Sequence, residues 1–539
     1  MTTIAGLLEA RRSDDHPGLI EAGATLSWAE VVEASERRAG FLIDRSNATR
    51  QQLGVLLPNG IEYLLWLFAA ALARQCVVGI NPTRRGAALA DDIRATDCQL
   101  IITDEQGASS LRGLDLGAAT NAVLLADEIR SSLPAARRLH GAQEDDLLLL
   151  LFTSGTTGTP KAVRCTQGRL AGIAETAAPA YGYSRSDICY CPMPLFHGNA
   201  LMALVAPALL VGAQIALPPK FSARSFLSDV RAYRATTFTY VGKAIAYLLA
   251  TEPNEHDRDN QLDRAFGTEA SSADRARFEE RFGCRLVEGY GSSEGGVNIV
   301  ATPDTPPGAL GPAPPGGDLA IVDIVTGAEM ARARFDRGGV LLNGSDAIGE
   351  LVNRAGIGKF EGYYGTPEAE ATRTRDGWYW TGDLAYRDEA GFFYFAGRSG
   401  DWLRVDSENL AAAPIESVLS RYEDFAAVAI YPVPDVATSA GDAVMLAAEL
   451  ARDSSFDPSD FRSWLTKQAD LGTKWIPSYI RLVEQLDETA TGKITKVRLR
   501  KEGWHCDDLI FVRTSRDGAY IELLPEEKAA LDAGLAKRK

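Results

Sequence analysis

Cysteine is scarce in this sequence, and its few copies do not form motif pairs. Seven cysteines are scattered over 539 residues, and none belongs to a C-x-x-C pair. An odd number of scattered cysteines is typical of reduced thiols in a cytosol rather than of a disulfide framework. Cys189 and Cys191 would share one face of a strand, where we expect core filling rather than metal or redox chemistry. These features predict a cytoplasmic protein.

Positive charge is also in short supply. The chain has 56 Lys and Arg residues against 72 Asp and Glu residues, which gives a formal net charge of −16. Such a charge repels polyanions over most of the surface, so nucleic acid is not an expected partner. A local basic patch can still hold a small phosphorylated ligand, because charge acts over only about 10 Å at ordinary salt.

Long uninterrupted apolar runs are missing as well. The N-terminus lacks the basic region and apolar run of a signal peptide. Pro207 and Gly212 interrupt the apolar stretch Ala200–Leu217, and Tyr63–Ala73 is shorter still. Both stretches therefore indicate buried helices, and no transmembrane segment is predicted.

What is present is an ordinary globular composition with alternating helix and strand patterns. Hydrophobic residues make up 46% of the chain and charged residues 24%. The strand-like runs Val77–Ile80 and Gln99–Thr103 flank a helical pattern near Leu89–Ala95, and Asn59 is expected to cap a helix before them. A later example of this rhythm is a helix over Phe226–Tyr233 followed by a strand over Thr236–Val241. The alternation predicts an α/β multidomain protein.

Two further stretches indicate how the chain is divided. Proline and glycine accumulate over Pro303–Gly317, which predicts a loop that enters a β-rich section. The helix and strand pattern restarts after Gly400. We therefore expect an N-terminal domain over residues 1–399 and a smaller C-terminal α/β domain over residues 400–539.

A hydroxyl-rich segment follows the strand-like run Leu147–Leu151. Glycines in this segment permit a tight loop whose backbone N–H groups and side chains converge on an anion. The order of residues differs from that of a Walker A loop. The segment predicts a phosphate cradle formed by Thr153, Ser154, Gly155, Thr156, Thr157, Gly158 and Lys161.

This segment closely resembles the phosphate-binding signature of the adenylate-forming superfamily, which includes acyl-CoA synthetases. Ala162 stands where that family usually has glycine. Lys161 is either a phosphate ligand or a solvated loop residue. The resemblance implies a large N-terminal domain of α/β subdomains with a β-rich portion, a small mobile C-terminal domain, and an active site between the two.

A second motif, Glu288–Gly296, resembles the family signature Y-G-x-T-E, with Ser293 in place of threonine. Its glycines miss the spacing of a dinucleotide-binding loop. By resemblance, Tyr290, which stands between Gly289 and Gly291 in the sequence, stacks on adenine, and Ser293 contacts phosphate. Glu294 holds Mg²⁺, together with Thr156. The alternative for Glu294 is an exposed turn glutamate.

The short segment Gly267–Ser271 matches the position of the family loop that lines the adenine, with Gly267, Thr268 and Glu269 as the expected contacts. Its sequence departs from the commoner family form. Together with Arg281–Cys284 and Tyr290–Gly295, it resembles the very-long-chain acyl-CoA synthetase and fatty-acid-transport-protein branch.

Two later motifs also resemble the family. One comprises Trp380–Asp383 and Gly397–Arg398. The resemblance implies that Asp383 accepts hydrogen bonds from the ribose hydroxyls and that Arg398 donates to ribose or phosphate. In Thr489–Arg500, it makes Lys493 the lysine that neutralises charge during adenylation. The basic residues after Lys493 are either a solvated face or an attraction for CoA and ATP; they are Lys496, Arg498, Arg500 and Lys501.

The motif Pro192–Asn199 resembles a family segment whose histidine lies between the acyl pocket and the nucleotide. We therefore expect His197 to position the carboxylate or to gate the pocket rather than to be a structural histidine, without requiring proton transfer.

The resemblance implies an AMP-forming acyl-CoA ligase that uses ATP, Mg²⁺ and CoA. Its expected substrate is a large hydrophobic carboxylic acid, a long or very-long-chain fatty acid or a steroid side-chain acid. The alternatives are an acyl-AMP ligase that delivers to a carrier protein, a luciferase-like monooxygenase and a non-catalytic lipid-binding relative. The sequence leaves three questions open: whether the protein makes peripheral membrane contact, whether lysine acetylation regulates it, and whether it is an oligomer such as a homodimer.

Overall fold

The computed structural model forms two compact units. Unit 1 comprises Met1–Ala301 and Ile357–Thr374, and unit 2 comprises Thr302–Gly356 and Arg375–Lys539. The predicted boundary at Gly400 lies outside the described residues, so the division into residues 1–399 and 400–539 stays a prediction. The structure describes residues 2–45, 51–153, 161–270, 272–336, 341–398, 402–405, 408–435, 442–468, 471, 475–489, 494–515 and 518–536.

The first sheet of unit 1 is parallel except at one edge. Its strand order is β6-β5-β3-β4-β7-β8, and only β8 runs antiparallel to its neighbour. The strands are β3 (Gln52–Leu56), β4 (Cys76–Gly79), β5 (Cys98–Thr103), β6 (Val123–Leu125), β7 (Leu147–Thr153) and β8 (Lys161–Thr166). The helices of this region are α1 (Ile4–Glu9), α2 (Trp28–Arg45), α3 (Ile61–Ala73), α4 (Gly86–Ala95), α5 (Glu105–Leu111) and α6 (Ala126–Arg130), and a 3₁₀ turn covers Gly117–Ala119. The predicted alternation of strands and helices is confirmed here.

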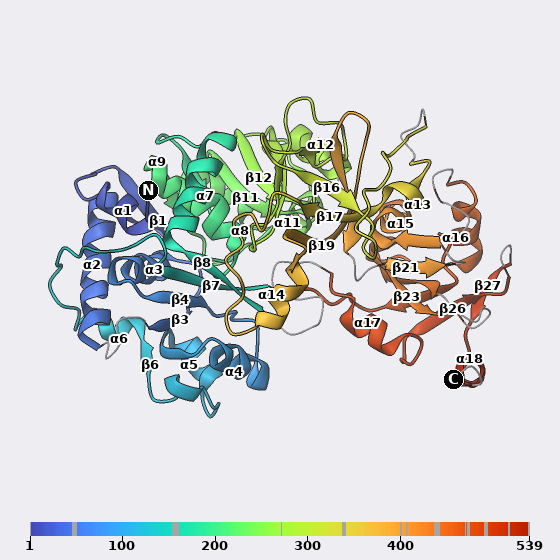
Figure 1. The fold of residues 1–539 in the computed structure, drawn as a ribbon, viewed down its shortest axis with the longest axis horizontal. Helices are drawn as coiled ribbons and strands as arrows, with labels where there is room; N and C mark the ends of the chain where they lie inside the picture. Colours follow the sequence, from blue (N-terminus) through green and yellow to red (C-terminus); the bar gives the residue numbers. More distant parts are fainter. Residues whose placement is uncertain are drawn as a thin grey trace. The chain divides into compact units, whose positions relative to one another are not determined.

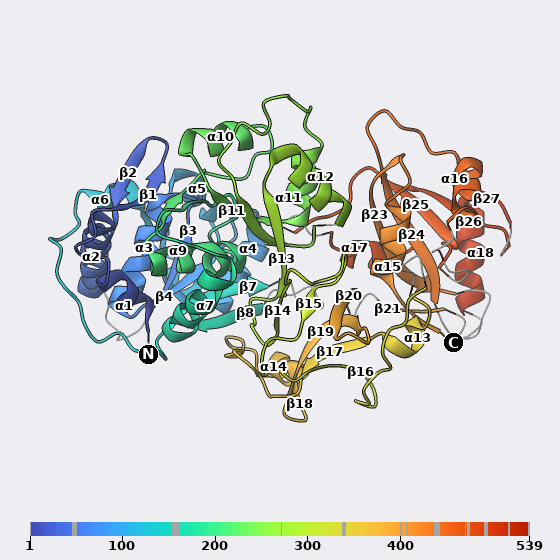
Figure 2. The ribbon, with the colours of Figure 1, turned by 90° about the horizontal axis from the view of Figure 1, so that it is seen from above.

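The second sheet of unit 1 has the order β14-β13-β12-β11-β9-β10-β1-β2. Figure 2 shows α10, α11 and α12 on one side of β11 and β13, with α7 and α9 on the other. The strands are β1 (Pro17–Glu21), β2 (Ala24–Ser27), β9 (Ile188–Tyr190), β10 (Gln214–Ala216), β11 (Thr237–Val241), β12 (Arg264–Thr268), β13 (Arg285–Gly291) and β14 (Asn298–Val300). The helices are α7 (Gln167–Ala180), α8 (Gly198–Ala200), a π-helical segment (Leu201–Val205), α9 (Ala206–Val211), α10 (Phe226–Tyr233), α11 (Gly242–Leu249), α12 (Ser272–Phe282) and α14 (Pro367–Arg373). Aromatic side chains on β11, α10 and α12 pack together with aliphatic side chains of α11 and hold these helices on the sheet.

Unit 2 contains a β-rich part and a C-terminal α/β part. The β-rich sheet has the order β15-β20-β19-β17-β16, with β18 beside β19. Its elements are β15 (Gly311–Pro312), β16 (Leu319–Val322), α13 (Gly344–Ala347), β17 (Gly349–Asn353), β18 (Thr374–Arg375), β19 (Trp378–Arg387) and β20 (Phe392–Arg398). The β-rich section expected after the loop Pro303–Gly317 is therefore confirmed.

The C-terminal sheet of unit 2 has helices on both faces, and its order is β23-β24-β25-β26-β27. In Figure 1, α15 and α16 lie above these strands and α17 lies below them, in agreement with the two apolar clusters of the sheet. The elements are β21 (Trp402–Val405), β22 (Glu408–Ala411), α15 (Ala412–Leu419), β23 (Phe425–Pro434), β24 (Asp442–Leu450), α16 (Pro458–Leu465), β25 (Tyr479–Val483), α17 (Val497–Glu502), β26 (Leu509–Arg513), β27 (Tyr520–Glu522) and α18 (Pro525–Ala536).

One local expectation is wrong. The residue at the N-cap of α3 is Gly60 rather than Asn59. The Asn59 amide instead donates to the carbonyl of Met193 at 2.8 Å and accepts from the backbone N–H of Leu195 at 2.9 Å. Asn59 therefore fixes the segment that leads to His197. Its buried amide satisfies backbone groups of that segment, which would otherwise lack hydrogen-bonding partners.

The run Tyr63–Ala73 is a core helix, as predicted, whereas Ala200–Leu217 is helical only as far as Val211 and then continues into β10. Tyr63 through Ala73 of α3 are all buried, and so are Cys189 and Cys191. Across the part of the chain that the structure describes, no helix combines the length and the apolar character needed to cross a membrane.

Candidate nucleotide site

The hydroxyl-rich segment connects two paired strands. β7 and β8 are antiparallel, and Thr153 lies opposite Lys161. The buried leucines at the centre of β7 anchor this pair in the core. Both ends of the predicted cradle are therefore fixed, whereas Ser154, Gly155, Thr156, Thr157 and Gly158 lie outside the described residues.

A segment distant in sequence lies along the free edge of β8. Tyr363 forms an isolated bridge with Val163, and the backbone N–H of Tyr364 donates to the carbonyl of Ala162 at 2.8 Å. The N–H of Arg164 donates to the carbonyl of Gly362 at 3.1 Å. These contacts hold the Tyr363 side chain next to the predicted phosphate cradle.

Glu294 is buried beside that cradle, with only 5% of its surface exposed. Its Oε1 accepts a hydrogen bond from the Tyr363 hydroxyl at 3.0 Å and a longer one from the Thr153 hydroxyl at 3.5 Å. The structure thus brings residues of the first two motifs together. The alternative of an exposed turn glutamate is wrong, because the carboxylate is enclosed.

Lys161 faces the same group of side chains. Its Nζ lies 5.5 Å from the centre of the Tyr363 ring, within the range of a cation–π contact. Burial lowers the pKa of Lys161, and the nearby charge of Arg373 lowers it further, whereas Glu294 acts in the opposite sense. Lys161 is therefore a partly buried cation at the rim of the cradle rather than a fully solvated loop residue.

Arg169 holds the turn that carries Glu294. Its guanidinium donates to the carbonyl of Arg164 at 2.6 Å and to the carbonyl of Ser293. Gly295 has a φ of +72°, and a Cβ there would lie 2.6 Å from Nη2 of Arg169. Glycine therefore suits the left-handed backbone conformation at this position, and a larger residue would press on the end of the Arg169 side chain.

The two motif loops expected around adenine leave neighbouring strands. β12 and β13 are parallel, with Gly267 opposite Glu288, so both loops lie at the carboxyl ends of their strands. Thr268 ends β12. Gly289, Tyr290 and Gly291 pair with β14 on the other side, and Tyr290 is partly buried. Glu269 has a φ of +72°, a conformation that non-glycine residues rarely adopt.

Glu288 is a partly buried carboxyl at this strand end. The Tyr240 hydroxyl donates to it at 2.6 Å. Burial raises the pKa of Glu288, which the Tyr240 hydrogen bond partly opposes. Its side chain faces the helices α10–α12, because Tyr240 belongs to the apolar cluster on that side.

The histidine motif lies against the second motif. His197 is partly buried and comes directly before α8. A Cβ on Gly198 would lie 2.7 Å from the Ser293 hydroxyl oxygen, so the two backbones approach closely. The structure therefore places the residue after His197 in contact range of the turn that carries Glu294.

In unit 2, the predicted ribose pair lies on adjacent strands. Asp383 of β19 is directly opposite Arg398 of β20 in the antiparallel register. The turn before Asp383 is fixed because the N–H of Gly382 donates to Glu350 at 2.7 Å and the Thr381 hydroxyl donates to the carbonyl of Leu351 at 2.7 Å.

Lys493 lies outside the described residues, but its flanks are defined. Glu488 and Ile494, on either side of the segment that contains Lys493, form an isolated bridge. Lys496 forms a 2.7 Å ion pair with Glu416, and only 10% of the Lys496 side chain is exposed. The interpretation of a solvated face is therefore wrong for Lys496.

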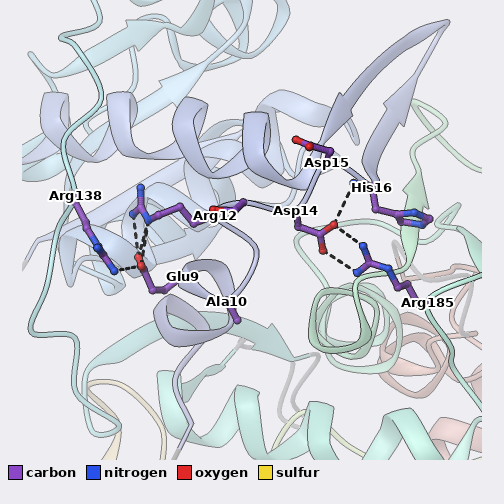
Figure 3. Close-up of a pocket in the computed structure, with 9 residues that line it drawn as sticks. Glu9, Ala10, Arg12, Asp14, Asp15, His16, Arg138 and Arg185 are labelled. Atoms are coloured by element: carbon purple, nitrogen blue, oxygen red, sulfur yellow. Dashed lines mark hydrogen bonds and ion pairs between the residues drawn. The ribbon is translucent and has the colours of Figure 1, made fainter.

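A cavity of about 770 Å³ lies elsewhere in unit 1. Figure 3 shows Arg185 paired with Asp14, and Arg12 and Arg138 both paired with Glu9, around this cavity. None of the predicted site residues lines it. Its charges compensate one another, which is typical of a structural ion-pair cluster at a surface.

The site includes residues that the sequence patterns did not single out. Tyr363, Arg373 and Arg169 all contribute side chains within this arrangement. No local pattern identifies them, because their partners lie in segments that only the tertiary fold brings close.

Comparison with known proteins gives an independent view of the chain. A profile described as AMP-binding enzyme matches residues 8–364. The steroid-22-oyl-CoA synthetase of Rhodococcus jostii (strain RHA1) is 50% identical over 539 residues, covering 98% of this chain and 97% of that protein. The medium/long-chain-fatty-acid–CoA ligase FadD17 of Mycobacterium marinum (strain ATCC BAA-535 / M) is 44% identical over 486 residues, covering 90% and 93%.

More distant proteins share the architecture. Long-chain fatty acid transport protein 1 of Mus musculus is 26% identical over 569 residues, covering 97% of this chain and 86% of that protein. The crystal structure of ATP-bound MatB from Rhodopseudomonas palustris superposes with a TM-score of 0.80 at 22% identity, covering 93% of this chain and 99% of that chain. The predicted adenylate-forming fold is therefore confirmed.

Proposed function

The chain belongs to the AMP-binding enzyme family, and on that premise we propose that it is an ATP-dependent, AMP-forming acyl-CoA ligase for a large hydrophobic carboxylic acid. In the first half-reaction, a carboxylate oxygen attacks the α-phosphorus of ATP, and the bond to the leaving pyrophosphate breaks. In the second, the CoA thiolate attacks the acyl carbon and AMP leaves. Adenylation is needed because a carboxylate is a poor electrophile.

The observation that carries this proposal is the buried carboxylate of Glu294 beside the hydroxyl-rich segment. Glu294 and Thr153 are far apart in sequence, yet their side chains meet at 3.5 Å. The phosphate-binding and carboxylate motifs thus converge on one place in unit 1. Such a convergence supports binding of a nucleoside triphosphate there.

A bound Mg²⁺ fits the chemistry of this place. Mg²⁺ commonly uses one or two carboxylates and completes its shell with phosphate oxygens and water. Among the described residues, no group of three or more His, Cys, Asp or Glu side chains is placed to hold a metal ion. In this proposal Glu294 would act as the carboxylate ligand, with Thr156 as the second protein contact. When bound, the ion would neutralise phosphate charge.

The other assignments are part of the same proposal. Tyr290 would stack on the adenine, and Asp383 would accept hydrogen bonds from the ribose hydroxyls with Arg398 beside it. Their register on β19 and β20 supports a joint role for Asp383 and Arg398. His197 would position the carboxylate of the acid. Lys493 would neutralise charge in the transition state of adenylation.

For the acid itself, we propose a steroid side-chain acid or a medium- to long-chain fatty acid. A steroid-22-oyl-CoA synthetase that is 50% identical and a medium/long-chain-fatty-acid–CoA ligase that is 44% identical support these two classes. The branch of fatty acid transport proteins gives weaker support, because its member is only 26% identical.

The deciding experiment measures ATP-dependent pyrophosphate release and thioester formation with free CoA across fatty, aromatic and steroidal acids. We expect both products with large hydrophobic acids. Pyrophosphate release without a CoA thioester would favour the acyl-AMP ligase that uses a carrier protein. Failure to form an adenylate from any acid would overturn the proposal.

A further inference from the structure

Three side chains of unit 1 form a hydrogen-bonded chain that ends on Glu294. The Tyr363 hydroxyl donates to Oε1 of Glu294 at 3.0 Å, and Nε of Arg373 lies 3.4 Å from the same hydroxyl. Tyr363 and Glu294 are only 3% and 5% exposed. Both Tyr363 and Arg373 come from the segment Ile357–Thr374, which contains none of the predicted site residues.

The chemistry of the three groups fixes the direction of these hydrogen bonds. A guanidinium only donates, and an ionised carboxylate only accepts. Because Arg373 donates to the Tyr363 oxygen, the single hydroxyl proton of Tyr363 is left to point at Glu294. A donor that is itself polarised by a cation makes a stronger hydrogen bond.

Both hydrogen bonds to Glu294 end on the same oxygen. Thr153 and Tyr363 each approach Oε1, and within the described part of the chain no hydrogen bond ends on Oε2. This arrangement fixes the rotation of the carboxylate through one oxygen. Neither of these two hydrogen bonds occupies the other oxygen.

The backbone around Tyr363 is held independently of its hydroxyl. The bridge between Tyr363 and Val163 and the hydrogen bond from Tyr364 to Ala162 join this segment to β8. Lys161 lies over the face of the Tyr363 ring at 5.5 Å. A phenylalanine at this position would therefore keep the ring and the backbone contacts and lose only the hydroxyl.

We propose that Tyr363 is a positioning residue, which holds the Glu294 carboxylate through Oε1 so that Oε2 faces the bound divalent cation, and that Arg373 orients Tyr363. This inference rests on the proposed function, which assigns Glu294 to Mg²⁺. Groups that orient a metal ligand typically change metal affinity or activity by about 10–100-fold when they are removed. Tyr363 and Arg373 would act only through Glu294.

The test compares Tyr363→Phe with Tyr364→Phe. Tyr364 is a matched control, because its hydroxyl donates to Asp97 at 2.9 Å instead of Glu294 and its backbone belongs to the same segment. Adenylate formation is measured as a function of Mg²⁺ concentration at saturating ATP. Calorimetry then measures ATP binding with Mg²⁺ and with a chelator.

For Tyr363→Phe, we expect the Mg²⁺ concentration at half-maximal rate to rise about 10-fold or more. The gain in ATP affinity that Mg²⁺ confers should shrink by a similar factor, whereas ATP affinity in the chelator stays unchanged. Tyr364→Phe should match the wild type in both measurements. An unchanged Mg²⁺ response of Tyr363→Phe, or an equal shift in Tyr364→Phe, would overturn the inference.

Arg373→Met provides a second variant if Tyr363→Phe fails to fold. It removes the donor to Tyr363 but leaves the hydrogen bond to Glu294, so a smaller shift in the same direction is expected, and the absence of any shift would contradict the inference. Wild-type protein that makes no adenylate would overturn the proposed function instead. The two failures are therefore distinguishable.

Discussion

Two regions of the molecule hold their functional residues by different physical means. In unit 1, Glu294 is 5% exposed, and its hydrogen-bonding partners Tyr363 and Thr153 are uncharged. In unit 2, Lys496 and Arg498, which follow Lys493, form ion pairs with Glu416 and Asp487. Their side chains are 10% and 41% exposed, respectively.

The difference has a consequence for how each region tolerates change. A buried group that loses its hydrogen-bonding partner pays a desolvation penalty of about 1–3 kcal/mol. An exposed ion pair contributes only about 0.2–1 kcal/mol, because water and salt screen it. We therefore expect single substitutions near Glu294 to act strongly through orientation, and single ion pairs near Lys493 to act weakly.

The largest expected effect breaks this pattern, because it comes from Lys493 in unit 2. Lys493→Ala should slow adenylation by about 10²–10³-fold, as expected for the loss of a charge partner in the transition state. ATP binding should survive. Pyrophosphate release by the purified variant measures the first effect, and calorimetry measures the second. Release at the wild-type rate would contradict the role of Lys493, and Lys501→Ala serves as a control in the same basic run.

Asp383→Ala sharpens the comparison in the β-rich part of unit 2. Loss of hydrogen bonds to an ionised carboxylate, at about 1.5–3 kcal/mol, should weaken ATP binding by about 10–100-fold. The melting temperature should change little, because Asp383 is only partly buried. Titration calorimetry checks the affinity. The exposed Glu389, in the turn between β19 and β20, gives a control as Glu389→Ala, and equal ATP affinity in both variants would count against the ribose assignment.

Gly295→Ala tests whether the orientation of the Glu294 carboxylate in unit 1 is as tightly fixed as its buried contacts indicate. Gly283 is a matched control, because Gly295 and Gly283 both have a φ of +72°, yet a Cβ on Gly283 would meet nothing within 4 Å. Both alanines cost about 1–2 kcal/mol of backbone strain. Only Gly295→Ala also presses on Arg169 and displaces the Glu294 turn, so its adenylation rate should fall by roughly 10-fold relative to Gly283→Ala.

Rates and thermal unfolding curves for the two glycine variants separate the effects. If both variants lose stability and activity equally, backbone strain alone explains Gly295, and Arg169 has no special part in holding Glu294.

The elements and motifs near these residues differ in how far the sequence reveals them. The helix over Phe226–Tyr233 is where its apolar spacing predicts it, and β11 begins one residue later than the predicted strand. Periodicity suffices there because each element has one buried face. The partners Tyr363, Arg373 and Arg169 could not be found this way, since a contact across the fold leaves no local pattern.

Asn59 shows the same limit from another side. An asparagine before a helix has the right chemistry for a cap, but its amide satisfies three groups of the chain that leads to His197. A cap contributes about 1 kcal/mol, whereas unmade hydrogen bonds at several buried groups would cost more in total. Tertiary packing therefore overrides the local preference.

The smallest expected effect comes from Arg498→Gln. The ion pair of Arg498 with Asp487 measures 2.7 Å, but both side chains are 41% exposed. We expect a loss of at most about 1 kcal/mol in the stability of unit 2. High salt should abolish this loss, because it screens exposed charges.

Lys496→Met is the sharper comparison, since Lys496 is 10% exposed and its removal leaves Glu416 without that partner. Thermal unfolding at low and high salt should show a larger and less salt-sensitive loss for Lys496→Met. Equal losses would mean that burial does not set the strength of these two ion pairs, and the contrast between the two regions would then rest on the hydrogen bonds of Glu294 alone.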